Sequence, residues 1–198
     1  AEETARRILA AFLARLETSW FEEIRLDDVA ADAGVTVQTV IRRCGGKDGL
    51  LEAAMLQLDA EILQDRQLPA GDVHRAVDLI IAEYEEHGEL VMRMLAQEDR
   101  HAAIRRLTDH GRRTHREWVG AVFAPWLDRL TGADRTELHD RLVIALDLYI
   151  WKLLRVDMHR PREALRRTMI ALCMDALAAC QPAQAANLAL SEKPHEQL

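Results

Sequence analysis

The segment GVTVQTVIRRCGGK, residues 34–47, carries three cations and no acid, in a chain of 198 residues with a net charge of −7. Its side chains suit contact with DNA. Glutamine can form two hydrogen bonds with adenine, arginine can form two with guanine or bind a phosphate, and valine and threonine can touch the methyl group of thymine. The candidate DNA-contacting residues of the segment are Thr36, Val37, Gln38, Thr39, Arg42, Arg43 and Lys47.

Two short helices and the turn between them would place these side chains on one surface. Apolar spacing predicts a helix over residues 26–33, which Gly34 ends, and Thr36 can cap the next helix, over residues 37–44. This is the spacing of a helix-turn-helix, whose second helix contacts bases in the major groove. Four apolar residues are expected to hold that helix against its neighbours: Val35, Val40, Ile41 and Cys44.

The residues that follow predict a phosphate-binding helix start. Gly45 and Gly46 let the backbone approach closely, and Lys47 would add its charge to the free N–H groups of a helix that begins at Asp48. A plainer interpretation is a three-helix unit that only packs, with its cations on a solvated face. We favour DNA contact because the turn, the cap, the apolar spacing and the lack of acids agree with one another.

The rest of the chain has helical periodicity and no pattern typical of a strand, so the predicted fold class is all-α. We expect a helix-turn-helix domain over residues 1–47 and a larger helical-bundle domain over residues 48–180, in which 48–66 form a connecting helix. Residues 181–198 are expected to be a loose tail. The later helices are expected over residues 73–86, 90–98, 101–130 with a kink or break at Pro125, 135–156 and 162–179.

Composition and motifs exclude several classes of function. The 26 Lys and Arg are outnumbered by 33 Asp and Glu, so contact with nucleic acid must be local. No apolar run could span a bilayer and no signal peptide opens the chain, which predicts a cytoplasmic protein without membrane contact. Phosphate-loop, dinucleotide and nucleophile-elbow motifs are missing, so we expect neither enzymatic activity nor a cofactor. Three scattered cysteines predict no metal site and no disulfide: Cys44, Cys173 and Cys180.

An ordered set of residues between Ile8 and Met55 matches a known pattern. The set is Phe12, Phe21, Leu26-Asp27-Asp28-Val29-Ala30, Ala33-Gly34-Val35-Thr36, Thr39-Val40, Lys47-Asp48 and Leu50-Leu51. In these residues the chain resembles the TetR (tetracycline repressor) family of bacterial regulators. The resemblance implies a DNA-binding regulator whose larger helical domain binds an effector and forms a dimer.

Some positions depart from the family's pattern. Ile41 stands where the family usually has a tyrosine that contacts a phosphate, so we expect Arg43 to take that role and Lys47 to keep its usual one. Arg25 stands where the family has a Ser or Thr helix cap. It cannot accept backbone hydrogen bonds, but it could reach a phosphate, and it joins the candidate DNA-contacting residues.

The apolar segment LVIALDLYIWKLL, residues 142–154, is typical of a buried helix. The resemblance implies that the last two long helices of each chain form a four-helix homodimer interface, and two DNA half-sites also require a dimer. Asp147 interrupts this segment. We expect it to form an ion pair within the chain or between subunits and, as a weaker hypothesis, to anchor an effector.

The resemblance implies a ligand cavity among the helices of the larger domain, and aromatic and methionine side chains suit such a cavity because they give adaptable contact area. For any one of these side chains, ordinary core packing is the stronger interpretation. The candidate effector-binding residues are Tyr84, Met94, Trp118, Val122, Asp147 and Trp151.

Together these features predict a repressor that binds a palindromic operator in double-stranded DNA as a homodimer. A small, largely apolar effector would release it. The alternative is a helical small-molecule carrier or protein-interaction module that no longer contacts DNA, for which Ile41 and Cys44 are the best support.

Overall fold

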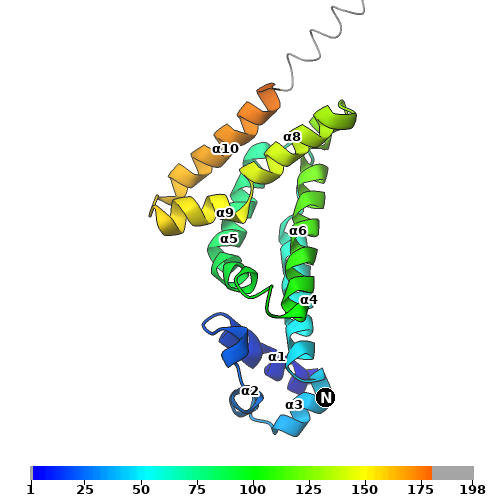
Figure 1. Cartoon of the computed structure of the whole chain (residues 1–198), viewed down its shortest axis with the longest axis vertical. Coiled ribbons are helices and arrows are strands. Elements are labelled where there is room, and N and C mark those ends of the chain that lie inside the picture. The colour runs from blue at the N-terminus through cyan, green and yellow to red at the C-terminus, as the bar shows by residue number, and fades with distance from the viewer. Residues whose placement is uncertain (1, 180–198) are drawn as a thin grey trace, which may run out of the picture. The chain divides into compact units, whose positions relative to one another are not determined.

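The computed structural model describes residues 2–179, and its regular structure is helical throughout (Figure 1). No strand occurs in this part of the chain, so the predicted all-α fold class is confirmed. The described residues form two compact units, and α5 and α6 each contribute to both. The first unit consists of residues 2–67 and 83–114, and the second consists of 68–82 and 115–179.

The first unit begins with the helix-turn-helix. Its elements are α1 (Glu2–Leu16), a 3₁₀ turn (Phe21–Glu23), α2 (Leu26–Asp32), α3 (Val37–Cys44) and α4 (Lys47–Asp65). The apolar stripe of α1 meets buried side chains of the other three helices in one core, formed by Ile8, Phe12, Leu16, Val29, Val40, Leu50 and Leu51. Burial of each such side chain contributes about 1.5–3 kcal/mol. The boundary expected after residue 47 falls at the start of α4, within this unit, and stays a prediction.

Helix α5 (Val73–Leu95) is continuous, so the prediction of two helices over residues 73–86 and 90–98 is wrong. Gly88 lies in the gap between the two predicted helices, but a glycine inside a helix costs only about 1 kcal/mol relative to alanine and need not end it. The break predicted at Pro125 is confirmed, because α6 (Ala102–Val122) stops there and α7 (Ala124–Leu127) starts with that proline in its first turn.

A single helix over residues 135–156 is also wrong. The chain forms α8 (Gly132–Ala145), α9 (Leu148–Trp151) and a π-helical segment (Lys152–Asp157). The break occurs at Asp147, whose backbone is extended, with φ −75° and ψ 148°. Its Oδ1 accepts a hydrogen bond of 2.8 Å from the Tyr149 N–H, which caps α9. A short polar side chain in an apolar run therefore acts as a helix cap.

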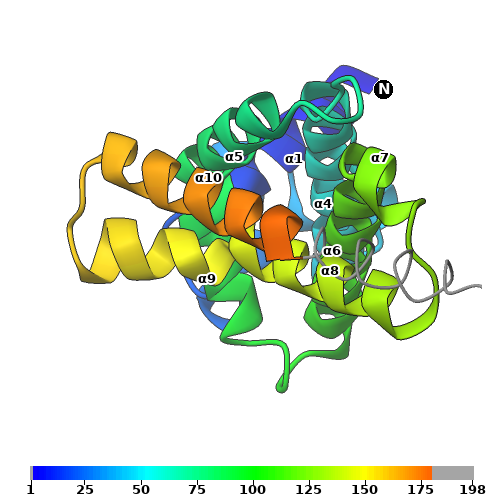
Figure 2. The same cartoon turned by 90° about the horizontal axis from the view of Figure 1, so that it is seen from above.

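The last described helix, α10 (Arg162–Ala179), lies beside α8 in the second unit (Figures 1 and 2). Buried Leu138 and Leu142 of α8 and buried Leu165 and Met169 of α10 belong to the core of this unit. Arg166 of α10 also donates a 2.6 Å hydrogen bond to Asp78 of α5. The expected tail over residues 181–198 lies outside the described residues.

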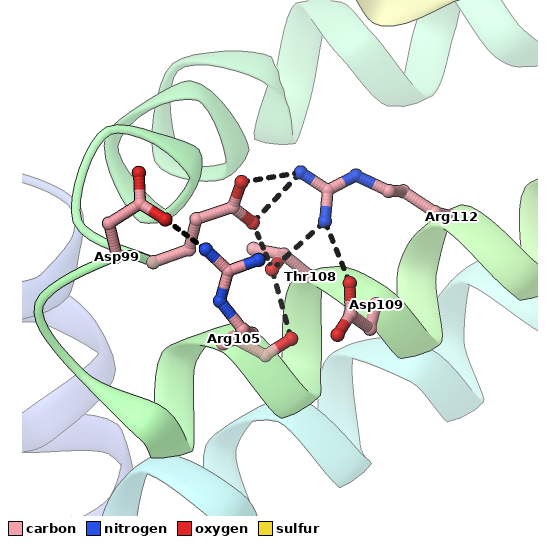
Figure 3. Close-up of polar contacts among 6 residues, drawn as sticks. Asp99, Arg105, Thr108, Asp109 and Arg112 are labelled. Atoms are coloured by element: carbon pink, nitrogen blue, oxygen red, sulfur yellow. Dashed lines mark hydrogen bonds and ion pairs between the residues drawn. The ribbon is translucent and has the colours of Figure 1, made fainter.

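The connection from α5 to α6 carries a cluster of ion pairs within the first unit (Figure 3). Arg112 donates to both carboxylate oxygens of Glu98, at 2.6 and 2.8 Å, and to Asp109 at 3.0 Å. Thr108 donates to Glu98 as well, and Arg105 pairs with Asp99. The Glu98 side chain is only 15% exposed, and the Arg112 hydrogen bonds, with a smaller contribution from Thr108, hold its pKa below the ordinary range of glutamate.

Removal of this carboxylate should destabilise the fold in a pH-dependent way. Because the pKa of Glu98 is lower in the folded than in the unfolded chain, its stabilisation is present above the ordinary glutamate range and is lost as the pH falls through the folded pKa. We expect Glu98→Gln to lower the free energy of unfolding by about 1–2 kcal/mol at pH 7. The difference from the wild type should vanish at acid pH in urea titrations. Asp109→Asn, at an exposed carboxylate, is the control and should change stability little at either pH.

Candidate nucleic-acid interface

The turn before α3 fixes the direction of that helix. Gly34 has a φ of 63°, a left-handed backbone conformation that residues other than glycine rarely adopt. The Arg7 guanidinium donates to the carbonyl of Ala33 at the end of α2. Thr36 is extended, and its Oγ1 accepts a 3.3 Å hydrogen bond from the Thr39 N–H, so the predicted cap of α3 is confirmed.

One face of α3 packs into the core and the other lies in solvent. Val40 is fully buried, and Val37 and Cys44 are half-buried beside it. Gln38, Arg42 and Arg43 are exposed. The structure therefore brings three candidate residues of α3, Gln38, Arg42 and Arg43, onto a single outer surface, whereas Val37 packs against the core and its contact with DNA stays a prediction. Thr36 and Thr39 stand at its N-terminal end, with their hydroxyl oxygens 3.0 Å apart.

Ile41 does not pack inward, so its predicted role in holding α3 against its neighbours is wrong. The side chain is 51% exposed. Successive residues of a helix are rotated by about 100°, and Val40 already occupies the centre of the buried face. Ile41 is therefore turned to the outer surface, where sequence reasoning had placed no large apolar side chain.

The arginines of this surface are available to a ligand. Neither Arg42 nor Arg43 forms an ion pair with any acid among residues 2–179. Arg25, at the start of α2, makes no side-chain cap hydrogen bond and lies 3.7 Å from an exposed carboxylate oxygen of Asp27. Such a solvated pair contributes little, so it would not prevent the guanidinium from binding a phosphate.

The junction between α3 and α4 is built from glycines. Gly45 and Gly46 have φ values of 73° and 91°. A Cβ on Gly49, in the first turn of α4, would lie 1.8 Å from the carbonyl oxygen of Cys44. The close approach of the two helix ends therefore requires glycine at position 49, which the sequence alone did not reveal.

Lys47 begins α4 but its ammonium group is turned toward the 3₁₀ turn. Its Nζ donates a 3.1 Å hydrogen bond to the Glu22 carbonyl and lies 4.5 Å from the centre of the Phe21 ring. Burial lowers the pKa of this lysine. The side chain thus ties α4 to the preceding turn, and its predicted contact with a phosphate stays a prediction.

Sequence reasoning missed Gln97, which holds the helix-turn-helix to the α5–α6 connection. Its side chain is 1% exposed, its Oε1 accepts a 3.0 Å hydrogen bond from the Phe21 N–H, and its Nε2 donates to the Arg93 carbonyl at 2.9 Å. His101 lies 3.0 Å from a Glu22 carboxylate oxygen in the same region. The only signal in the sequence is a lone amide one turn after Met94.

The candidate effector-binding residues are divided between the two units. Tyr84 and Met94 belong to the first, where Met94 packs in the core shared with α1 to α4. Trp118 and Val122 lie one turn apart on α6 in the second, and Trp151 lies in α9. These five side chains are buried, and their role in effector binding stays a prediction.

Asp147 differs from its expected role. It pairs with no cation among the described residues, and the nearby Lys152 is bound instead to Asp157, with 2.7 Å between Nζ and Oδ2. The predicted ion pair within the chain is therefore not formed by any cation of residues 2–179. The carboxylate is retained because it satisfies a backbone N–H at the start of α9.

Other site types find no support in the described residues. No group of three His, Cys, Asp or Glu side chains within residues 2–179 is arranged to hold a metal ion. None of the described helices is at once long enough and apolar enough to cross a membrane. Cys44 and Cys173 are free thiols, and burial raises the pKa of Cys173 to about 12, while Cys180 lies outside the described residues.

Comparison with known proteins gives structural matches only, since no protein-family model and no curated protein matches the chain. A TetR-family transcriptional regulator from Streptomyces coelicolor has a TM-score of 0.70 at 19% identity, over 99% of this chain and 92% of that one. A transcriptional regulator from Rhodococcus sp. Rha1 gives 0.68 at 17% identity, over 88% and 96%. A putative TetR-family regulator from Mesorhizobium loti MAFF303099 gives 0.67 at 19%, over 89% and 96%.

Proposed function

Because the chain has the fold of TetR-family transcriptional regulators, we propose that it is a DNA-binding transcriptional regulator of the cytoplasm. It acts as a repressor that binds a palindromic operator as a homodimer and is released by a small, largely apolar effector. The observation that carries this proposal is the outer surface of α3, where exposed Gln38, Arg42 and Arg43 project from a helix held firmly by Val40.

This surface has the chemistry of a major-groove ligand. It offers an amide for adenine and two arginines for guanine or phosphate, and residues 34–47 contain no acid that would repel DNA. A small-molecule carrier would have no use for such a surface, so the carrier alternative leaves these side chains unexplained. The overall charge of −7 implies that affinity depends on two copies placed in register rather than on a general attraction to DNA.

The test is binding to duplex DNA. The full chain should select specific duplexes from a random-sequence pool by binding them. In a gel assay it should reduce the mobility of the DNA that flanks its own gene. Affinity for both should fall steeply with salt, because bound phosphates release counterions. A folded protein that binds no duplex at low salt would contradict the proposal.

Exposed apolar side chains in the C-terminal part of the second unit support a homodimer. They come from α8, α9, the π-helical segment and the residue after it, and α10: Ile144, Tyr149, Leu153, Val156, Met158, Leu172 and Met174. Most of the apolar face of α10 is already buried within the chain, including Leu165, Met169 and Cys173. The side chains that remain exposed are therefore the ones available to a second copy.

Carboxylates introduced on this surface should separate the protomers. Ile144→Glu together with Met174→Glu should weaken dimerisation at least about 100-fold, because charges would be buried without partners. Both side chains are exposed in the protomer, so its fold should survive. Analytical ultracentrifugation measures the shift to monomer, and Leu56→Glu, at an exposed position of α4, is the matched control. A double variant that dimerises like the wild type would contradict this placement.

Effector binding is part of the same proposal. The effector changes DNA binding because its affinities for two arrangements of the dimer are unequal. A ligand changes DNA binding only if it binds one arrangement of the dimer more tightly than another. The buried aromatic and methionine side chains Tyr84, Met94, Trp118 and Trp151 are the candidates for contact, together with Val122 and the cap residue Asp147. Screening lipophilic compounds by thermal shift tests this, because a ligand of the folded state raises the melting temperature.

A further inference from the structure

The exposed isoleucine on the outer surface of α3 points to a specific chemical feature of the operator. We propose that Ile41 contacts the C5-methyl group of a thymine in each half-site and so determines part of the sequence specificity. This inference rests on the proposed function, because it concerns the same surface of α3.

The position of Ile41 is the first support. Its side chain is 51% exposed although it is large and apolar, and it is not among the residues that pack in the core of the first unit, where Val40 is the fully buried residue of α3. On a helix, Ile41 lies next to Val37, one turn earlier, and next to Gln38, three residues earlier. Val37, which is half-buried, and Ile41, which is exposed, therefore form a small apolar strip along the edge of the hydrogen-bonding residues.

The chemistry of DNA provides the second support. Isoleucine has no polar atom, so it can neither bind a phosphate nor form a hydrogen bond with a base edge. In the major groove of unmodified DNA, the only methyl group that the bases present, and so their largest apolar group, is the C5-methyl group of thymine. An apolar strip beside Gln38 thus fits a thymine close to the base pair that the glutamine contacts. The expected half-site contains a thymine whose methyl group, rather than its hydrogen-bonding pattern, is recognised.

The experiment removes that methyl group and nothing else. A duplex that the full chain selects from a random pool is synthesised again with each thymidine replaced in turn by deoxyuridine. The dissociation constant of each duplex is measured by fluorescence anisotropy. The wild type should bind about fourfold more weakly when the sensitive thymine of one half-site is replaced, as expected for one buried methyl group. In Ile41→Ala, the ratio of affinities for thymine and uracil duplexes should fall to about one at that position.

Two variants separate this role from others. Arg42→Ala should weaken binding to both duplexes while leaving the thymine-to-uracil ratio intact, because it removes a different contact. Ile41→Val should keep part of the ratio, since most of the apolar surface remains. Circular dichroism should show that all three variants stay folded, as expected for changes at exposed positions.

The outcomes distinguish the inference from the function on which it rests. A selected duplex in which no thymine is sensitive to loss of its methyl group would overturn the inference alone. The same holds if Ile41→Ala keeps the wild-type ratio at every thymine. If the folded wild type selects no duplex at all, the proposed function fails, and this inference fails with it.

Discussion

The double variant Arg42→Ala, Arg43→Ala should lose about a thousandfold or more in affinity for its DNA site. A dimer presents four of these arginines, and each is expected to contribute about 1 kcal/mol or more, whether it contacts guanine or a phosphate. Each phosphate contact that is lost should also reduce the slope of log affinity against log salt concentration by about 0.9. Fluorescence anisotropy across a salt series measures both effects.

The structure provides a matched control for this loss. Arg75 in α5 and Arg116 in α6 are exposed, so replacing both with alanine changes the net charge by the same amount outside the helix-turn-helix. The control should keep near-wild-type affinity, and both double variants should melt like the wild type. If the two double variants weaken DNA binding equally, general charge and not the surface of α3 governs the interaction.

Gly49→Ala should destabilise the first unit more than the addition of a methyl group at any other glycine of that unit. The added Cβ would lie 1.8 Å from the Cys44 carbonyl oxygen and 2.9 Å from its carbon, and these are backbone atoms at the end of α3. The end of α3 or the start of α4 must therefore move. We expect the free energy of unfolding to fall by about 3 kcal/mol, as for a severely overpacked site, and DNA affinity to fall with it, because α3 is displaced.

Gly111→Ala is the comparison that isolates this steric effect. Gly111 lies within α6, and a Cβ there would meet nothing within 4 Å. Alanine favours the helix, so this variant should be more stable than the wild type by about 0.5–1 kcal/mol. Urea denaturation of both variants should therefore give changes of opposite sign. Equal stability of the two would show that the junction can relax around the extra methyl group.

The helix-turn-helix could be predicted from the sequence because its signals are local. Gly34 has the left-handed backbone expected of it, and Thr36 caps α3 through the Thr39 N–H. Both roles depend on residues a few positions apart, where turn chemistry determines the structure. The break at Pro125 was predictable for the same reason.

The roles that the sequence did not reveal depend on contacts between distant residues or on small differences in helix phase. Gln97 accepts a hydrogen bond from Phe21, 76 positions away, and no local pattern indicates that pair. Ile41 and Val40 are adjacent apolar residues that the sequence does not distinguish, and only the packed helix shows which of the two is buried. Asp147 was interpreted as a charge within one helix, whereas the chain breaks there and uses it as a cap.

Site-specific photocrosslinking tests the central claim most directly. A photoreactive amino acid at position 38, exposed on α3, should crosslink to the selected duplex at two positions related by twofold symmetry and separated by about one helical turn or a multiple of it. The same group at position 137, exposed on α8 in the second unit, should give none. Crosslinks from position 137 but not from position 38, in a protein that binds the duplex, would contradict the account.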